Sequence, residues 1–103
     1  MQFGLDARNR NKRSLFKLGQ TLSTPGALDA LGKARVTPSD LLQRHITGDW
    51  GDTLPEDRDL NEEALVMRTR IFSAYLLPHT GEKIWIITEA DRSATTLLLP
   101  EEY

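Results

Sequence analysis

The stretch that decides the fold is Arg-Ile-Phe-Ser-Ala-Tyr-Leu-Leu (residues 70–77) followed by Lys-Ile-Trp-Ile-Ile-Thr (residues 83–88). The first segment alternates loosely, and the second is rich in the β-branched and aromatic residues that favour strands. The turn between them contains Gly81, where a positive φ is needed. A third segment of the same kind, residues 94–99, follows a polar turn and ends at Pro100. Residues 83–88 are apolar on both faces, as is typical of a central strand, so the C-terminal third predicts an antiparallel meander.

Upstream of the meander, two helices are expected to begin at Thr-Pro pairs. Thr24-Pro25 supplies a hydroxyl that can cap free amides and a proline whose fixed φ suits the first helical position. Thr37-Pro38 repeats this arrangement. Gly32 and Gly48 are expected to end these helices, because glycine readily takes the left-handed position after the last turn.

A third helix is expected from Asp59, which with Glu62 resembles a capping box. Leu60, Ala64 and Met67 would share one face of it. Residues 15–22 indicate a short first strand. The order β-α-α-α-β-β-β predicts an α+β fold, with about three helices packed on one face of a three- to four-stranded antiparallel meander.

The composition indicates one domain. The chain has 103 residues, of which 39% are hydrophobic and 27% charged, as in ordinary globular proteins. The lack of cysteine excludes disulfides, thiolate zinc sites and a cysteine nucleophile. No apolar run approaches the roughly 20 residues needed to cross a bilayer. We therefore expect no membrane partner and a cytoplasmic location.

Charge is distributed unevenly along the chain. The first 17 residues carry a net charge of about +4, which leaves about −6 for the rest. Residues 1–13 are interpreted as a mobile basic tail and residues 14–103 as a single α+β domain. The tail can contact phosphates, so nucleic-acid binding through it stays open. The acidic remainder argues against a broad nucleic-acid footprint, and the acidic end, residues 100–103, suits a basic protein surface.

Two polar clusters are candidate sites. The first, residues 45–52, contains His45, Asp49 and Trp50 between glycines. In a structural interpretation Asp49 bonds loop amides, Trp50 fills the core and His45 is a hydrogen-bonded core residue. In a functional interpretation Asp49 and Trp50 contribute to binding and His45 moves protons.

The second cluster, residues 88–93, lies between the two strongest strands. Asp91 and Ser93 can satisfy the turn's amides, and Arg92 can pair with a neighbouring acid, which would make the turn self-contained. Alternatively Asp91, Arg92 and Ser93 form a binding patch, in which Arg92 holds phosphate. Arg70, Tyr75 and Glu89 would then complete a catalytic set with His45 and Arg92.

Several chemistries lack a signal. The chain has no glycine-rich phosphate loop, nucleophile elbow or metal-binding helix motif, so neither a metal nor a cofactor is expected. Phe72, Tyr75 and Trp85 are interpreted as core residues rather than a base-stacking platform.

Residues 15–103 resemble a family of short bacterial proteins found on plasmids, phages and integrated elements. These are labelled plasmid-related protein or, misleadingly, type I restriction enzyme subunit M. The likeness rests on Leu18-Gly19-Gln20, Thr24-Pro25-Gly26-Ala27-Leu28, His45 with Gly48-Asp49-Trp50-Gly51, Ser73 and Tyr75, residues 84–93 and Leu99-Pro100-Glu101-Glu102-Tyr103. The basic tail and residues 66–70 depart from the pattern. The resemblance implies a mobile-element accessory protein, and the chain is too short for a methyltransferase with a cofactor-binding sheet.

Two functions therefore stay open. The first is a mobile-element accessory protein that binds a host protein of defence or replication. The alternative is a metal-independent ribonuclease, by analogy with the RelE and barnase type of fold. Its candidate residues are those of the catalytic set named above.

Overall fold

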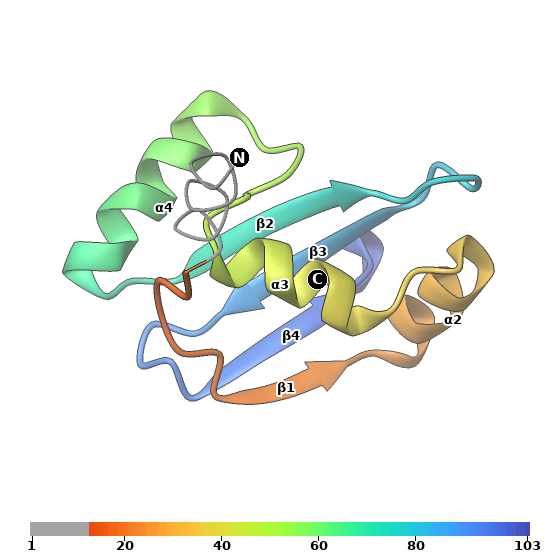
Figure 1. Cartoon of the computed structure of the whole chain (residues 1–103), viewed down its shortest axis with the longest axis horizontal. Coiled ribbons are helices and arrows are strands. Elements are labelled where there is room, and N and C mark those ends of the chain that lie inside the picture. The colour runs from red at the N-terminus through yellow and green to blue at the C-terminus, as the bar shows by residue number, and fades with distance from the viewer. Residues whose placement is uncertain (1–12) are drawn as a thin grey trace, which may run out of the picture.

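The computed structural model describes residues 13–103, which form three α-helices and a four-stranded sheet (Figure 1). In chain order the elements are β1 (Gln20–Ser23), α2 (Pro25–Ala34), α3 (Pro38–Ile46), α4 (Pro55–Met67), β2 (Ile71–Leu76), β3 (Lys83–Thr88), β4 (Ala94–Leu98) and the 3₁₀ helix η1 (Pro100–Glu102). This order confirms the predicted α+β fold. Residues 1–12, which hold nearly all of the predicted basic tail, lie outside the described residues.

The sheet has the strand order β1-β4-β3-β2 and is mixed. β2, β3 and β4 form the predicted antiparallel meander, whereas β1 runs parallel to β4. The expectation of a purely antiparallel sheet was therefore wrong for β1. Short turns set the directions of the other strands, but β1 is separated from β4 by all three helices, and a parallel pair needs a long crossover of that kind.

β1 also begins later than the predicted strand of residues 15–22. Gly19 has a φ of +66°, and a Cβ atom there would lie 2.4 Å from backbone atoms of Arg92 and Ser93. Only glycine can make this close approach at a positive φ. The chain turns at Gly19, so pairing with β4 starts at Gln20.

Both Thr-Pro pairs cap helices as predicted. The Thr24 hydroxyl accepts a hydrogen bond from the Ala27 amide at 3.0 Å. At the start of α3 the Thr37 hydroxyl accepts from the Asp40 amide, and the Asp40 carboxylate accepts from the Thr37 amide. This reciprocal capping box satisfies two amides that have no partner within the helix.

Two other helix ends differ from the prediction. α2 continues past Gly32 to Ala34, because Arg35 takes the left-handed position and donates its amide to the carbonyls of Leu31 and Gly32. α4 begins at Pro55, not Asp59, so proline opens all three helices. α4 buries Asn61 and Ala64, whereas Leu60 and Met67, expected on the same face as Ala64, are exposed.

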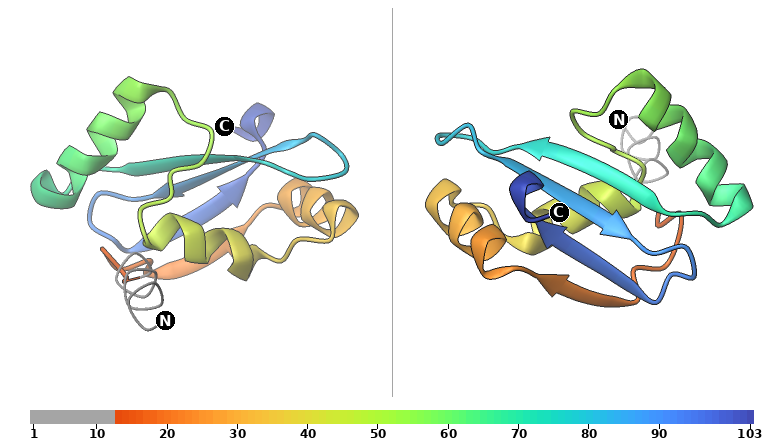
Figure 2. Two further views of the ribbon diagram at one scale, coloured as in Figure 1. Left: turned by 45° about the horizontal axis from the view of Figure 1, so that its top comes forward. Right: turned by 180° about the vertical axis from the view of Figure 1, so that it is seen from behind.

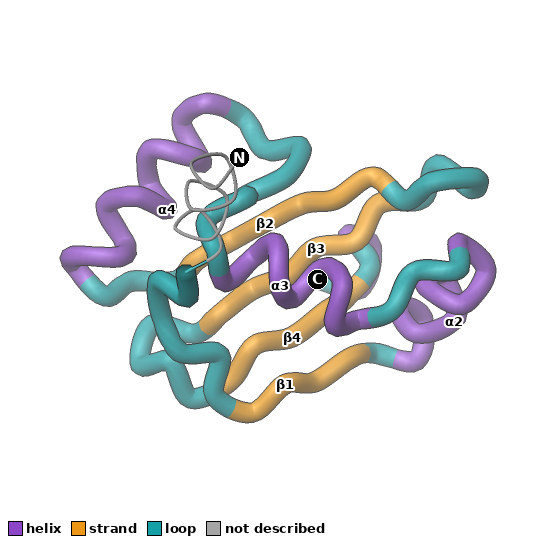
Figure 3. The backbone as a smooth tube through the Cα atoms, in the orientation of Figure 1, coloured by secondary structure: helices purple, strands orange, loops and turns teal. Residues whose placement is uncertain are grey.

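Alternate strand residues point to opposite faces of the sheet. One face packs against α2 and α3, and we call it the helix face (Figure 3). The strand residues on it are Ile71, Ser73, Tyr75, Ile84, Ile86, Thr88, Thr95 and Leu97. Seen from behind in Figure 2, no α-helix of the described chain crosses the other side of β2, β3 and β4, which we call the open face.

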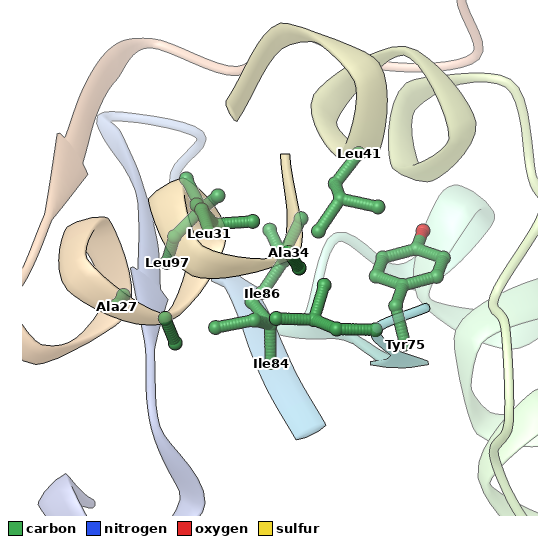
Figure 4. Packing of buried hydrophobic residues seen from close by; sticks show 10 residues of the cluster. Ala27, Leu31, Ala34, Leu41, Tyr75, Ile84, Ile86 and Leu97 are labelled. Atoms are coloured by element: carbon green, nitrogen blue, oxygen red, sulfur yellow. The ribbon is translucent and has the colours of Figure 1, made fainter. Parts of the chain in front are cut away.

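The main core lies between α2, α3 and the helix face (Figure 4). α2 contributes Leu31 and three alanines, whose small side chains let the helix lie close to the sheet. Leu41 of α3 and Tyr75, Ile84, Ile86 and Leu97 of the sheet complete this layer.

α4 lies along the outer edge of β2 (Figure 1). The Asn61 side chain donates to the Phe72 carbonyl at 2.6 Å and accepts from the Phe72 amide at 3.0 Å. Further along β2, the Trp50 carbonyl accepts from the Ala74 amide. These bonds occupy the edge of β2, which would otherwise be free to pair with another strand.

Candidate functional site

The open face carries a group of apolar and aromatic side chains that we call the aromatic patch. Its members are Phe72, Trp85, Ile87, Leu98 and Tyr103. Phe72 stands opposite Ile87, and Trp85 stands opposite Leu98, in adjacent strands. Phe72 and Trp85 are only partly buried, and Tyr103 is 69% exposed.

The three aromatic rings touch edge to face. The Phe72 and Trp85 ring centres lie 5.1 Å apart, and those of Trp85 and Tyr103 lie 5.8 Å apart. With Ile87 and Arg70 they line a cavity of about 230 Å³. The prediction that Phe72 and Trp85 are core residues was therefore wrong, since both line this surface cavity, whereas Tyr75 does lie in the core.

The C-terminal turn places Tyr103 beside Trp85. Glu102 accepts hydrogen bonds from the Thr24 hydroxyl at 2.6 Å and from the Leu99 amide at 2.8 Å. The Thr24 hydroxyl, with the Leu99 amide second, lowers the pKa of the Glu102 carboxyl. These bonds tie η1 to the start of α2, 78 residues away in the chain, and so hold the turn that carries Tyr103.

Arg70 links the patch to a charged rim. Its guanidinium donates to the Tyr103 hydroxyl at 3.1 Å, and its Nε atom lies 3.7 Å from the Glu89 carboxylate. The side chains of Arg70 and Glu89 are each about half exposed. This is the one place where the structure brings two predicted catalytic residues together at the surface.

His45 lies in a buried chain of polar side chains. Its Nδ1 atom is 2.6 Å from the Ser73 hydroxyl, and its Nε2 atom is 2.8 Å from the Thr88 hydroxyl. The Thr88 hydroxyl is hydrogen-bonded to the Thr95 hydroxyl, and Thr95 donates to the Leu18 carbonyl. Burial, followed by the charge of Arg92, lowers the pKa of His45 to about 3. His45 is therefore neutral near pH 7 and has no exposure to solvent.

Arg92 is a structural clamp in this arrangement. Its guanidinium donates to the carbonyls of Ala64, Thr69, Glu89 and Ala90 at 2.7–3.1 Å. It thus joins the β3–β4 turn to the C-terminal end of α4, where a positive charge is favoured. The expected pairing of Arg92 with a neighbouring acid is replaced by these backbone contacts.

The first polar cluster is held together by its own side chains. Arg44 binds the Asp49 carboxylate through two nitrogens, and Asp49 accepts from the Gly51 amide. The Arg44 hydrogen bond is the main reason that the pKa of Asp49 is lowered. Trp50 is 5% exposed and donates to Glu62 at 3.0 Å. Asp49 and Trp50 were predicted to bind a partner. In the structure their polar side-chain atoms bind other residues of the same protein.

The remaining predicted residues divide between core and turn. Tyr75 is buried in the core and donates its hydroxyl to the Asp49 carbonyl at 2.6 Å. Asp91 accepts from the Ser93 amide at 2.9 Å in an exposed turn, as the structural interpretation expected. The two polar clusters do meet in space, through His45 and Thr88, but they meet inside the protein.

Sequence reasoning missed the aromatic patch. Phe72 and Tyr75 are three positions apart in one strand, so they point to opposite faces. Trp85 lies between Ile84 and Ile86, which fill the core. Strict alternation was the available signal for Phe72 and Trp85. No local signal placed Tyr103 beside them.

Within residues 13–103 no cluster of His, Asp or Glu is suited to hold a metal ion. In the same region no helix is long and apolar enough to cross a membrane. The chain matches no known protein-family model, no curated protein and no solved structure. Its function is therefore inferred from the geometry of the site.

Proposed function

We propose that this chain is a mobile-element accessory protein that binds a host protein through the aromatic patch. The observation that carries the proposal is a sheet face, covered by no α-helix of residues 13–103, that joins Trp85, Tyr103 and Arg70 around one cavity. Trp, Tyr and Arg are the residue types most enriched among the side chains that dominate protein–protein binding energy. The mobile-element origin rests on the family resemblance of the sequence.

The patch is prepared for binding because its side chains are already positioned. Ile87 and Leu98 are each 7% exposed and stand beside Phe72 and Trp85 in the adjacent strands. Glu102 fixes the turn that bears Tyr103. Little side-chain freedom would be lost when a partner covers this surface, which favours affinity.

Charge favours a basic partner surface. Residues 13–103 contain fourteen acidic and ten basic side chains. Glu101 lies in the same turn as Tyr103, and Glu89 lies at the rim beside Arg70. We infer a partner with an apolar or aromatic ridge flanked by Lys or Arg, because complementary charge steers association and fixes orientation.

A second candidate function is the metal-independent ribonuclease. It is favoured by Arg70, Glu89 and Tyr103, which meet at the surface beside aromatic rings on which a base can stack. In this candidate Glu89 is the general base and Arg70 contacts the phosphate. His45, Tyr75 and Arg92 contribute nothing directly to such a site, because they are committed to interior contacts.

The test is co-purification of the tagged full chain from a bacterial lysate, with and without nuclease treatment, followed by direct titration of the purified partner. Tyr103→Ala removes an exposed patch residue, and Leu60→Ala removes a comparably exposed apolar residue of α4. We expect Tyr103→Ala to weaken binding about tenfold or more, as for an interface hot spot. Leu60→Ala should leave the affinity unchanged.

Equal binding by both variants would overturn the assignment to the patch. If only RNA is retained, and Glu89→Gln lowers its cleavage by about 10²-fold with the fold intact, the ribonuclease is the function.

A further inference from the structure

A second cavity, of about 400 Å³, opens on the helix-face side of the sheet. Its wall contains Lys17, Arg68 and Arg92, with Phe16, Asp91 and two leucines, and we call it the basic pocket. Phe16 contacts the rings of His45 and Trp50, which places this wall on the opposite side from the aromatic patch. None of its lining residues belongs to that patch.

The basic pocket has excess positive charge. Three cations face one acid, Asp91, whose carboxylate accepts from the Ser93 amide. Among the described residues, Lys17, Arg68 and Arg92 form no salt bridge with a carboxylate, whereas Arg44 and Arg70 each form one. Cations that outnumber the acids around a cavity attract an anion.

Arg92 makes this charge a fixed feature of the pocket. The residue is only 9% exposed and its guanidinium is held by four backbone carbonyls, so the guanidinium cannot swing away into solvent. Burial, and after it the neighbouring charge of Arg68, lowers the pKa of Arg92. The two guanidinium groups therefore repel each other, and a bound anion would relieve that repulsion.

We propose that the basic pocket binds a phosphate group of a nucleic-acid backbone. Phosphate suits this wall because guanidinium and ammonium groups donate charge-assisted hydrogen bonds to its oxygens. A polymer is favoured over a single phosphate by the sequence that leads to the pocket. Arg8, Arg10, Lys12 and Arg13 precede Lys17 within ten residues, so the cations continue along the chain. The site is independent of the protein-binding function proposed above.

Arg68 offers a clean test because its backbone is left-handed, with a φ of 58° at the end of α4. Arg68→Gly removes the charge and suits this conformation, so the helix end is preserved. Arg35, at the end of α2, has a φ of 59° and does not line the pocket. Arg35→Gly is therefore the matched control, with the same loss of charge in the same backbone state.

The experiment titrates the full chain with a fluorescent single-stranded oligonucleotide at several salt concentrations. We expect Arg68→Gly to weaken binding roughly fivefold to tenfold and to reduce the salt slope by about one, with Arg35→Gly unchanged. Backbone NMR shifts should move around Lys17, Arg68 and Arg92. Tyr103→Ala should bind the oligonucleotide normally, so failure here is distinguishable from failure of the aromatic patch.

Other outcomes would overturn the proposal. If Arg68→Gly and Arg35→Gly weaken oligonucleotide binding equally, the effect comes from net charge and not from the pocket. NMR shifts confined to residues 1–12 would assign binding to the tail alone. If inorganic phosphate or a phosphopeptide binds with dependence on Arg68 while the oligonucleotide does not, the pocket serves another phosphate source, and the nucleic-acid assignment is wrong.

Discussion

The Nε2 atom of His45 lies 2.8 Å from the Thr88 hydroxyl, and neither side chain is exposed to solvent. Thr95 uses its only hydroxyl hydrogen on the Leu18 carbonyl, so Thr88 must donate to Thr95. His45 must then donate from Nε2 to Thr88 and accept from Ser73 at Nδ1. This order of donors and acceptors fixes the neutral imidazole in one tautomer. Every polar side chain in this buried row of hydrogen bonds then has a partner.

Stability should fall as the pH falls below about 6.5. In the unfolded chain His45 takes up a proton near its ordinary pKa of 6.5. In the folded chain burial lowers the pKa of His45 to about 3. Between these values the unfolded state binds more protons, so acid favours unfolding by up to about 1.4 kcal/mol per pH unit. Urea unfolding compared at about pH 7 and about pH 5 reads this slope before most carboxylates titrate.

The second histidine provides the control for this slope. His79 lies in an exposed turn with a φ of 70°, which asparagine also tolerates. His79→Asn should keep the wild-type pH dependence, whereas His45→Gln should be less stable at neutral pH and show a flatter slope. If His79→Asn loses the slope, the pH dependence comes from His79 and the prediction for His45 is wrong.

Thr95→Val should destabilise the protein although it preserves shape. The substitution leaves the Leu18 carbonyl and the Thr88 hydroxyl without their partner inside the core. Each unsatisfied buried group costs about 1–3 kcal/mol. Thr96→Val, on the open face of the same strand, should change the free energy of unfolding by less than about 0.5 kcal/mol. Similar effects of the two variants in urea denaturation would mean that the hydrogen-bond chain contributes little.

Arg92→Lys should also destabilise, even though charge is conserved. One ammonium group cannot reach the four carbonyls that the guanidinium joins, those of Ala64, Thr69, Glu89 and Ala90. We expect a loss of about 2–3 kcal/mol in the free energy of unfolding, from charge-assisted bonds that are no longer made. Arg35→Lys has a similarly positive φ at an exposed position and should be neutral. Equal losses would assign the effect to the backbone conformation.

The elements that sequence predicts well here are those with a local physical cause. Thr24 and Thr37 cap their helices through their own side chains, and short turns force β2, β3 and β4 into an antiparallel meander. The start of β1 and its direction depend instead on Gly19 meeting the backbone of Arg92 and Ser93. That contact spans more than seventy residues, so no local pattern contains it.

The candidate site shows the same division. Polar residues are the ones that a sequence offers as site candidates. His45 and Arg92 instead make hydrogen bonds inside the protein that connect separate elements. The aromatic patch was overlooked because apolar residues on both faces of β3 suggest burial on both sides. Whether a helix covers the second face is decided by tertiary packing, which strand composition does not encode.

Two glycines should respond in opposite ways to alanine. Gly51 has a φ of +73°, and a Cβ atom there would lie 2.1 Å from the Ala74 carbonyl oxygen, a backbone atom of β2 that cannot move aside. Gly51→Ala should therefore be strongly destabilising, by more than the roughly 1 kcal/mol of a strained backbone alone.

Gly32 lies within α2 with nothing within 4 Å of an added Cβ. Gly32→Ala should stabilise by about 0.5–1 kcal/mol, because alanine has less freedom to lose on folding. Thermal unfolding of both variants checks the pair, and a destabilised Gly32→Ala would contradict the extension of α2 to Ala34.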